Sequence, residues 1–264
     1  MNVEKLTVKE LKAYCQRLGI DTQGKKKPDL KDAIYAYEKA EIDRAIADGT
    51  HLELLTGKIR ELADRYAQTL GEKIAARKEE MKKDDNSHYL IYEVLGISSE
   101  DGQLIDEYQN TGRFLYKYAG SFLEEAATLC LSFFDRNGTK TLIENNQGSK
   151  PKTFEIDFLS GNHAIELKWR DATTDGDHIT KEHTRVKAIQ SQGYTPIRVM
   201  FYYPQRAQSI RIQETLKTIY AGVNGEYYAG DEAWSYLQAL SGYNLKAILK
   251  EIADGRGDEA KNNQ

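Results

Sequence analysis

The sequence predicts an α/β fold in which a small mixed sheet lies between helices, with a helical arm before it. Residues 154–169 alternate apolar and polar side chains around a turn, which is typical of two short strands. Residues 195–204 are apolar and β-rich, which favours a buried central strand. Most other segments place apolar residues at helical spacing, so helices should cover this sheet.

Residues 1–36 are predicted to form a compact helical unit. Apolar residues recur at helical spacing from Leu6 to Leu18, and Gly19 suits the end of that helix. A basic connection follows, and its lysines can neutralise phosphates beside the backbone donors at the start of a second helix. Those lysines are Lys25, Lys26 and Lys27. The alternative is a plain helical hairpin whose lysine loop is merely solvated.

Residues 37–86 are expected to be a helical linker. Apolar residues between Leu52 and Lys83 follow helical spacing with charges between them, which predicts a long amphipathic helix. This helix would pack on the domain that follows or on a sister subunit. Polar residues at 82–87 end the pattern and predict a surface linker.

Residues 87–264 form the predicted main domain. We expect a short helical pair around Gly96 and Gly102, and then a long helix from Phe114 to Phe134 that carries Glu124 and Glu125. After the strand pair, the pattern predicts further helices and the central strand. The helices are expected at 179–190, at 206–220 and, in two pieces broken at 241–242, at 231–253.

The strand pair at 154–169 carries the residues best suited to chemistry. A turn at 160–162 reverses the chain, and Glu166 and Lys168 then share one face of the second strand. Asp157 can therefore meet both side chains at one end of the hairpin. Two carboxylates and an amine suit a hard cation and the water that it polarises. The alternative is the polar face of an ordinary half-exposed hairpin.

Bulk composition sets wide bounds on function. The chain has 264 residues and a formal net charge of -4, a balance that neither favours nor excludes nucleic acid. Its two cysteines, Cys15 and Cys130, fall in apolar helical patterns and are expected to be core thiols. We find neither a Cys/His spacing typical of zinc nor an apolar run of membrane length nor a signal peptide. A soluble protein of a reducing, intracellular compartment is expected.

The pair formed by Asp157 and the triplet 166–168, Glu-Leu-Lys, resembles the PD-(D/E)xK nuclease superfamily. That pattern has an acid on one strand and an acid-x-lysine triplet on the next; Ile156 stands where a proline is usual. The resemblance covers roughly residues 110–220, and the segment from Glu166 to Arg185 is most similar to the ApaLI-like group. Acids at this spacing are common by chance, so the surrounding helix–hairpin–helix–strand pattern adds most of the specificity.

The N-terminal unit resembles a SAP module, a helix-extension-helix unit that binds DNA in many proteins. The features that match are Leu6, Leu11-Lys12, Gly19-Ile20, Gly24, Lys25 and Leu30. The resemblance therefore implies DNA binding by residues 1–36.

The superfamily resemblance implies a restriction-endonuclease-like mixed sheet flanked by helices, and a type II restriction endonuclease of double-stranded DNA. Asp157 and Glu166 would hold Mg²⁺, and Lys168 would orient the attacking water. The preceding helix would add a third carboxylate, for which Glu125 is our choice and Glu124 stays open. Cutting both strands of a palindrome implies a homodimer, and a restriction enzyme implies the cytoplasm of a prokaryotic cell.

The segment after the second strand supplies further DNA-binding candidates, because cationic and small polar side chains suit phosphates and base edges. These candidates are Arg170, Thr173, Asp175, Asp177, His178, Lys181 and Arg185. For each of them, a solvated surface position is the alternative.

Two other functions remain open at this point. One is a structure-specific repair or recombination nuclease of the same fold, which a defined fragment pattern on plasmid DNA would exclude. The other is a non-catalytic DNA-binding protein that works through its SAP-like arm. The intact set of Asp157, Glu166 and Lys168 argues against the second, because a binding protein has no need to keep it.

Overall fold

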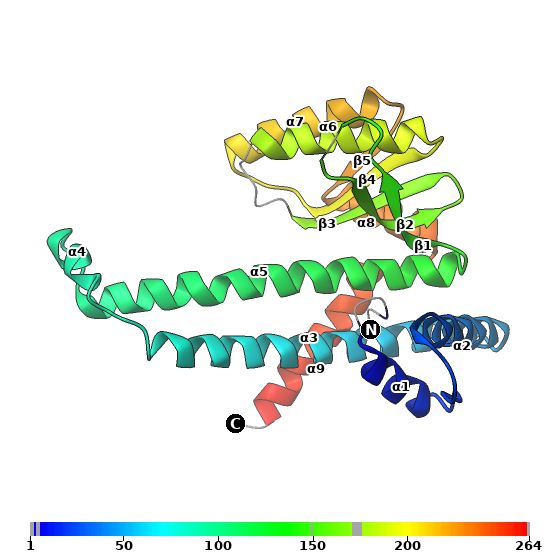
Figure 1. Cartoon of the computed structure of the whole chain (residues 1–264), viewed down its shortest axis with the longest axis horizontal. Helices are drawn as coiled ribbons and strands as arrows, with labels where there is room; N and C mark the ends of the chain where they lie inside the picture. Colours follow the sequence, from blue (N-terminus) through cyan, green and yellow to red (C-terminus); the bar gives the residue numbers. More distant parts are fainter. Residues whose placement is uncertain (1–2, 4–5, 149, 171–175, 263–264) are drawn as a thin grey trace. The chain divides into compact units, whose positions relative to one another are not determined.

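The computed structural model describes residues 3, 6–148, 150–170 and 176–262. The chain divides into two compact units, residues 1–59 and 60–264, and the division falls within helix α3. Figure 1 shows the elements in chain order. The helices are α1 (Val8–Arg17), α2 (Lys27–Ala47), α3 (His51–Met81), α4 (Tyr89–Val94), α5 (Ser99–Phe134), α6 (Gly176–Ser191), α7 (Ala207–Ala221), α8 (Asp231–Ser241) and α9 (Leu245–Asn262). The strands are β1 (Thr139–Glu144), β2 (Thr153–Ser160), β3 (His163–Arg170), β4 (Thr195–Tyr202) and β5 (Glu226–Ala229).

The first unit has the helix–extension–helix order that the sequence predicts. Thr7 and Glu10 form a reciprocal capping box that begins α1. The core between the helices is apolar and consists of Val3, Leu11, Cys15, Leu30 and Ile34. Helix α2 continues beyond residue 36 to Ala47 without a break.

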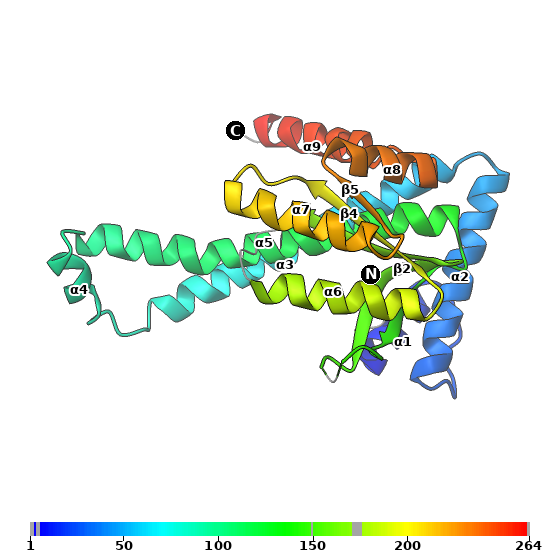
Figure 2. The same ribbon diagram turned by 90° about the horizontal axis from the view of Figure 1, so that it is seen from above.

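The second unit is built on one mixed sheet, which has five strands in the order β1-β2-β3-β4-β5 within the described residues. Strands β1, β2 and β3 are antiparallel neighbours, whereas β3, β4 and β5 run parallel. Parallel neighbours need crossover connections, and α6 and α7 provide them. Helices α6 and α7 cover one face of the sheet and α5 and α8 cover the other (Figures 1 and 2). The predicted α/β fold is thus confirmed.

The central strand β4 is buried along nearly its whole length, as its apolar run predicts. The edge strands β1 and β5 are not predicted by the sequence pattern. Most residues of β1 are exposed, and β5 has only four residues, so neither shows the burial-driven alternation that marks a strand in sequence.

Helix α4 is the first helix of the expected short pair, whereas the second helix of the pair and the separate long helix form one helix, α5, of 36 residues. The pattern predicts a break near Gly102, but this residue lies within α5 against Tyr92 of α4. A Cβ atom added at Gly102 would lie 2.6 Å from the Tyr92 ring. The glycine therefore permits close packing between two helices rather than ending one of them.

The part of α3 in the second unit lies antiparallel to α5. Tyr66 makes edge-to-face contacts with Tyr118 and Phe122, and the Lys78 ammonium lies 2.7 Å from the Glu107 carboxylate. These pairs fix the helical hairpin that α3 and α5 form. The two cysteines are free and buried, which confirms the expectation of core thiols. In the part of the chain that the structure describes, no helix is long and apolar enough to cross a membrane.

Candidate active site

The hairpin of β2 and β3 brings Asp157, Glu166 and Lys168 together, as their spacing predicts. The Leu167 backbone N–H donates a hydrogen bond of 2.9 Å to Asp157 Oδ2. The Lys168 ammonium lies 2.6 Å from Glu166 Oε1 on the same strand. Because β2 and β3 are adjacent antiparallel strands, these side chains lie next to one another. Helix α5 contacts both strands.

The pKa values of the two buried carboxylates shift in opposite directions, because their charged neighbours differ. Burial, reinforced by the charge of Glu166, raises the pKa of Asp157 to about 7. Burial would also raise the pKa of Glu166, but Lys168 and Arg185 outweigh it and lower that pKa to about 2. Near neutral pH the pair therefore holds its exchangeable proton on Asp157, while Glu166 stays ionised. Such a separation of pKa values is typical of functional sites.

Helix α5 contributes Glu124 rather than Glu125 to this cluster. Glu124 Oε1 lies 4.0 Å from Lys168 Nζ, and burial raises the pKa of this carboxyl. Glu125 instead lies 3.5 Å from the Arg65 guanidinium and bonds Tyr66, both on α3. Successive helical residues point about 100° apart, so only one of the two can face the sheet. In the structure, Glu124 rather than Glu125 therefore lies beside Lys168 and the other acids of the cluster.

Lys140 on β1 is a member of the cluster that the sequence reasoning missed. Its ammonium lies 2.6 Å from Glu155 Oε1 and 3.9 Å from Asp157 Oδ1. The sequence pattern places this residue in a turn, because it does not reveal β1 as a strand. Once the strand is recognised, antiparallel pairing with β2 places Lys140 opposite the acids of that strand.

Arg185, a predicted DNA contact, is turned inward toward two acids of the protein. Its guanidinium contacts Glu166 and lies 3.5 Å from Glu182, and only 20% of its side chain is exposed. Glu182 in turn lies 3.2 Å from Arg198 and accepts a hydrogen bond of 3.2 Å from the Tyr220 hydroxyl. Buried charge is costly unless it is paired, so this chain of partners compensates the ionised Glu166.

The other predicted DNA contacts are placed differently from one another. Arg170 is exposed at the end of β3, and its guanidinium lies 5.6 Å from the Tyr116 ring and 5.7 Å from the Trp169 ring. Lys181 is exposed on α6. Thr173 and Asp175 lie outside the described residues. Asp177 and His178 fall in the first turn of α6, with side chains outside the described part.

The three predicted lysines of the first unit lie at the start of α2. Lys26 is exposed at the N-cap position, where its backbone N–H donates a 2.8 Å hydrogen bond to Asp29 Oδ2. Lys25 and Lys27, on either side of it, are half-buried. The start of α2 thus presents cationic side chains at the positive end of the helix dipole.

The fit of the cluster to a metal ion depends on one oxygen of Glu166. Across residues 3, 6–148, 150–170 and 176–262, no group of three or more His, Cys, Asp or Glu side chains is arranged to hold an ion. The Lys168 ammonium and the Arg185 guanidinium instead occupy Glu166 Oε1. Glu166 Oε2, however, is buried and has no hydrogen-bond partner among the residues that the structure describes. A buried anionic oxygen without a partner, beside the Asp157 carboxylate, is the donor chemistry that a hard cation requires.

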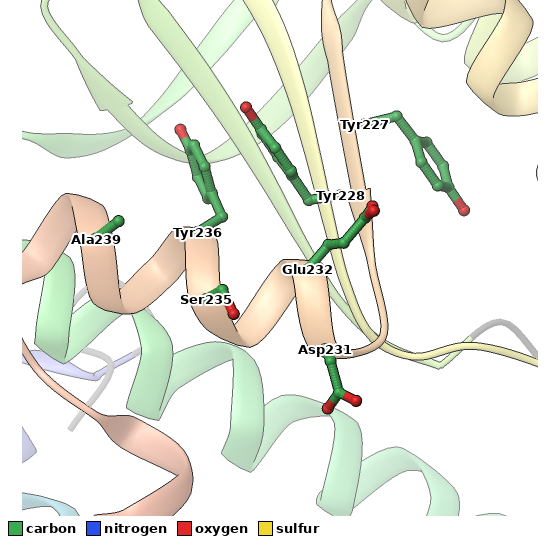
Figure 3. Close-up of a pocket in the computed structure, with 7 residues that line it drawn as sticks. All are labelled: Tyr227, Tyr228, Asp231, Glu232, Ser235, Tyr236 and Ala239. Atoms are coloured by element: carbon green, nitrogen blue, oxygen red, sulfur yellow. The ribbon is translucent and has the colours of Figure 1, made fainter.

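A shallow pocket lies elsewhere, between β5 and α8. Figure 3 shows the Tyr228 and Tyr236 rings face to face, with centroids 4.1 Å apart. The residues that line the pocket are Tyr227, Tyr228, Asp231, Glu232, Ser235, Tyr236 and Ala239. None of them belongs to the carboxylate cluster, so the pocket is separate from the candidate active site.

Comparison with known families gives two matches. The family described as ApaLI-like restriction endonuclease matches residues 34–254, and the family described as SAP domain matches residues 2–39. Both resemblances inferred from the sequence are thereby confirmed. Comparison with curated proteins and with solved structures gives no match.

Proposed function

The chain belongs to the ApaLI-like restriction endonuclease family, which implies DNA endonuclease activity, and from this premise we propose a type II enzyme that hydrolyses double-stranded DNA with Mg²⁺ at a specific sequence. The reaction centre is the cluster of Asp157, Glu166 and Lys168. Glu124 takes the place of Glu125 as the third carboxylate.

The observation that carries this proposal is the state of Glu166. Its side chain is 4% exposed and is held by Lys168 and Arg185 through one oxygen, while the other oxygen is buried and has no partner in the described part of the chain. A purely structural ion pair has no use for an unsatisfied anionic oxygen, because leaving such an atom unpaired is costly. A site that receives a cation explains it.

Each residue then has a distinct role. Asp157, Glu166 and Glu124 would hold the ion through oxygen atoms, and both glutamates lie within 4.0 Å of the Lys168 ammonium. When bound, Mg²⁺ lowers the pKa of a water and polarises the phosphate. The Lys168 ammonium orients that water and offsets the negative charge that grows on the phosphate oxygens. Arg185 keeps the Glu166 carboxylate in position from the α6 side.

DNA binding involves both units in this proposal. The basic start of α2 contacts phosphates and contributes affinity for any sequence. Arg170 is exposed at the end of β3, two residues after Lys168, and its guanidinium lies against the rings of Tyr116 and Trp169. Arginine in such a setting suits phosphate and base contacts. Cleavage of both strands requires two active sites, so the working enzyme is a homodimer.

The test is cleavage of phage DNA with Mg²⁺, followed by sequencing of the fragment ends. The full chain should give defined fragments that share one sequence at their ends. The variants Asp157→Asn and Glu166→Gln should lose activity by about 10³-fold or more, because several kcal/mol of transition-state stabilisation disappear. Glu144→Gln, an exposed acid on neighbouring β1, is the matched control and should cut normally.

Other outcomes would redirect or overturn the proposal. Cleavage that follows DNA structure rather than sequence would identify a repair or recombination nuclease of the same fold. Full activity in Asp157→Asn or Glu166→Gln would remove the cluster from the reaction. The first result changes the substrate class, and the second changes the active site.

A further inference from the structure

The distal end of the α3–α5 hairpin is unusually apolar on its surface. We call this surface the apolar tip and define it as the exposed apolar residues of α4 and its C-cap, with those of the first part of α5. These are Leu90, Ile91, Val94, Leu95, Leu104, Ile105 and Tyr108, each between 47% and 74% exposed. Within the described residues, no other stretch of similar length has as many exposed large apolar side chains.

The exposure of these side chains is imposed by specific contacts that hold α4 on α5. His88 Nε2 lies 3.1 Å from Asp106 Oδ2, and the Tyr92 hydroxyl donates a 3.1 Å hydrogen bond to the same carboxylate. The Ser99 hydroxyl donates a 2.6 Å hydrogen bond to Glu93. The polar and aromatic side of α4 therefore faces α5, and its aliphatic side chains are left pointing away. A loosely attached helix would instead fold its apolar side inward.

Exposed apolar residues continue along α5 beyond the tip, as far as Leu115. Ile105, Tyr108 and Leu115 follow spacings of three and seven residues, so they lie on one side of the helix. An apolar stripe at this spacing is typical of a helix that packs on another helix.

We infer that the apolar tip and this stripe are the surface through which two copies of the chain pair. The inference rests on the proposed function, which requires two active sites for one duplex, and it names the interface. At roughly 100 Å² of exposed area for each of eight large side chains, the surface approaches the ~800 Å² that each partner contributes to a standard interface. Monomeric proteins rarely leave a contiguous apolar surface of that size in water.

The charges around the tip favour a second copy over DNA. Residues 84–108 contain seven acidic residues and no Lys or Arg, so this segment repels phosphates. The adjoining residues 72–83 are net basic, and Lys73 on α3 and Lys83 just beyond its end are exposed. In a dimer with two-fold symmetry, every contact between the two copies occurs twice, once on each side of the symmetry axis. Two hairpins staggered by a few turns thus set the acids of one tip against the lysines of the other stem.

The test is the mass of the full chain in solution, measured by light scattering or sedimentation at micromolar concentration. The wild-type chain should be a dimer. Val94→Asp on α4 and Ile105→Asp on α5 should each lower the mass twofold, because burial of an unpaired carboxylate at an interface is costly. Both residues are exposed in the single chain, so circular dichroism and the melting temperature should show intact folding. Leu52→Asp is the control, because Leu52 is about as exposed as Ile105, at 53% against 51%, and lies outside the apolar tip. This variant should remain a dimer.

A second readout uses supercoiled plasmid. Loss of pairing should replace conversion to linear DNA by slow nicking of one strand. A wild-type monomer, or a dimer that survives both substitutions, would overturn the inference. The mass does not depend on catalysis, so a dimer that separates in both variants supports the interface even if the chain cuts no DNA.

Discussion

At the level of single residues, Glu166 shows how the local sequence creates a site. An alternating strand puts Glu166 and Lys168 on one face, and the antiparallel partner strand adds Asp157. That much follows from a period of two and one turn, so the sequence predicts it. The sequence does not show that Arg185 on α6 pairs with Glu166, because no local rule indicates which face of a distant helix contacts the sheet.

The choice between Glu124 and Glu125 illustrates the same limit. Helical spacing places both on α5, but only the packing of α3 decides which of them points away from the sheet. Arg65 and Tyr66 on α3 bind Glu125, which leaves Glu124 beside Lys168. A contact across such a distance in sequence leaves no trace in the pattern of one helix.

The first residue-scale prediction concerns Lys168. Lys168→Ala should abolish cleavage and keep Mg²⁺-dependent DNA binding, because the ammonium acts on the water and the phosphate rather than as a ligand. Lys168→Arg should rescue poorly, since a planar guanidinium cannot occupy the place of a compact ammonium 2.6 Å from Glu166 Oε1. Single-turnover cleavage and filter binding measure the two effects, and full activity in Lys168→Arg would refute the role.

The second concerns protons at Asp157, whose pKa burial raises to about 7. Its folded-state pKa is above the ordinary value, so below pH 7 a proton occupies the carboxylate that Mg²⁺ needs. Metal affinity should therefore fall about tenfold for each pH unit below 7 and level off above it. Calorimetric titration of Mg²⁺ into metal-free protein at several pH values measures this. The Asp157→Asn variant should bind more weakly and lose the slope, whereas a pH-independent wild-type affinity would contradict the assignment.

At the level of elements, the helices and the three inner strands could be predicted because burial imposes a period on their sequences. Strands β1 and β5 could not, since they lie at the two edges of the sheet and are stabilised by backbone pairing rather than by an apolar face. The missed β1 had a further cost, because Lys140 at the site went unrecognised with it.

The turn between α5 and β1 depends on one close approach. A Cβ atom at Gly138 would lie 2.1 Å from the ring of Phe158, a fully buried residue of β2. Gly138→Ala should therefore displace that ring and lower the free energy of unfolding by about 1–3 kcal/mol. Urea denaturation measures it. Gly148→Ala is the matched control, because its Cβ would meet neighbours only at 3.8 Å or more and should change stability by less than about 1 kcal/mol.

At the level of the whole molecule, the proposed function assigns recognition and chemistry to both compact units in different shares. The carboxylate cluster lies in residues 60–264, and the basic start of α2 lies in residues 1–59. Family matches cover both parts, with the SAP match ending at residue 39 and the nuclease match beginning at residue 34. We therefore expect removal of the lysines at the start of α2 to change how tightly the enzyme binds DNA without changing which sequence it cuts.

This expectation defines the last prediction, in which Lys25, Lys26 and Lys27 are all replaced by Ala. Binding should weaken alike for cognate and random duplexes, and the slope of log K against log salt should become shallower by about 0.9 for each phosphate that is no longer neutralised. Sequence choice should not change, because phosphate contacts position a protein and base contacts specify. The fold should tolerate the change, since alanine is a good helix former at the start of α2. Lys246→Ala with Lys250→Ala, in exposed positions on α9, controls for the removal of charge and should leave the slope unchanged. An unchanged slope in the triple variant would make the N-terminal unit purely structural, and a collapse of sequence choice would mean that it reads bases.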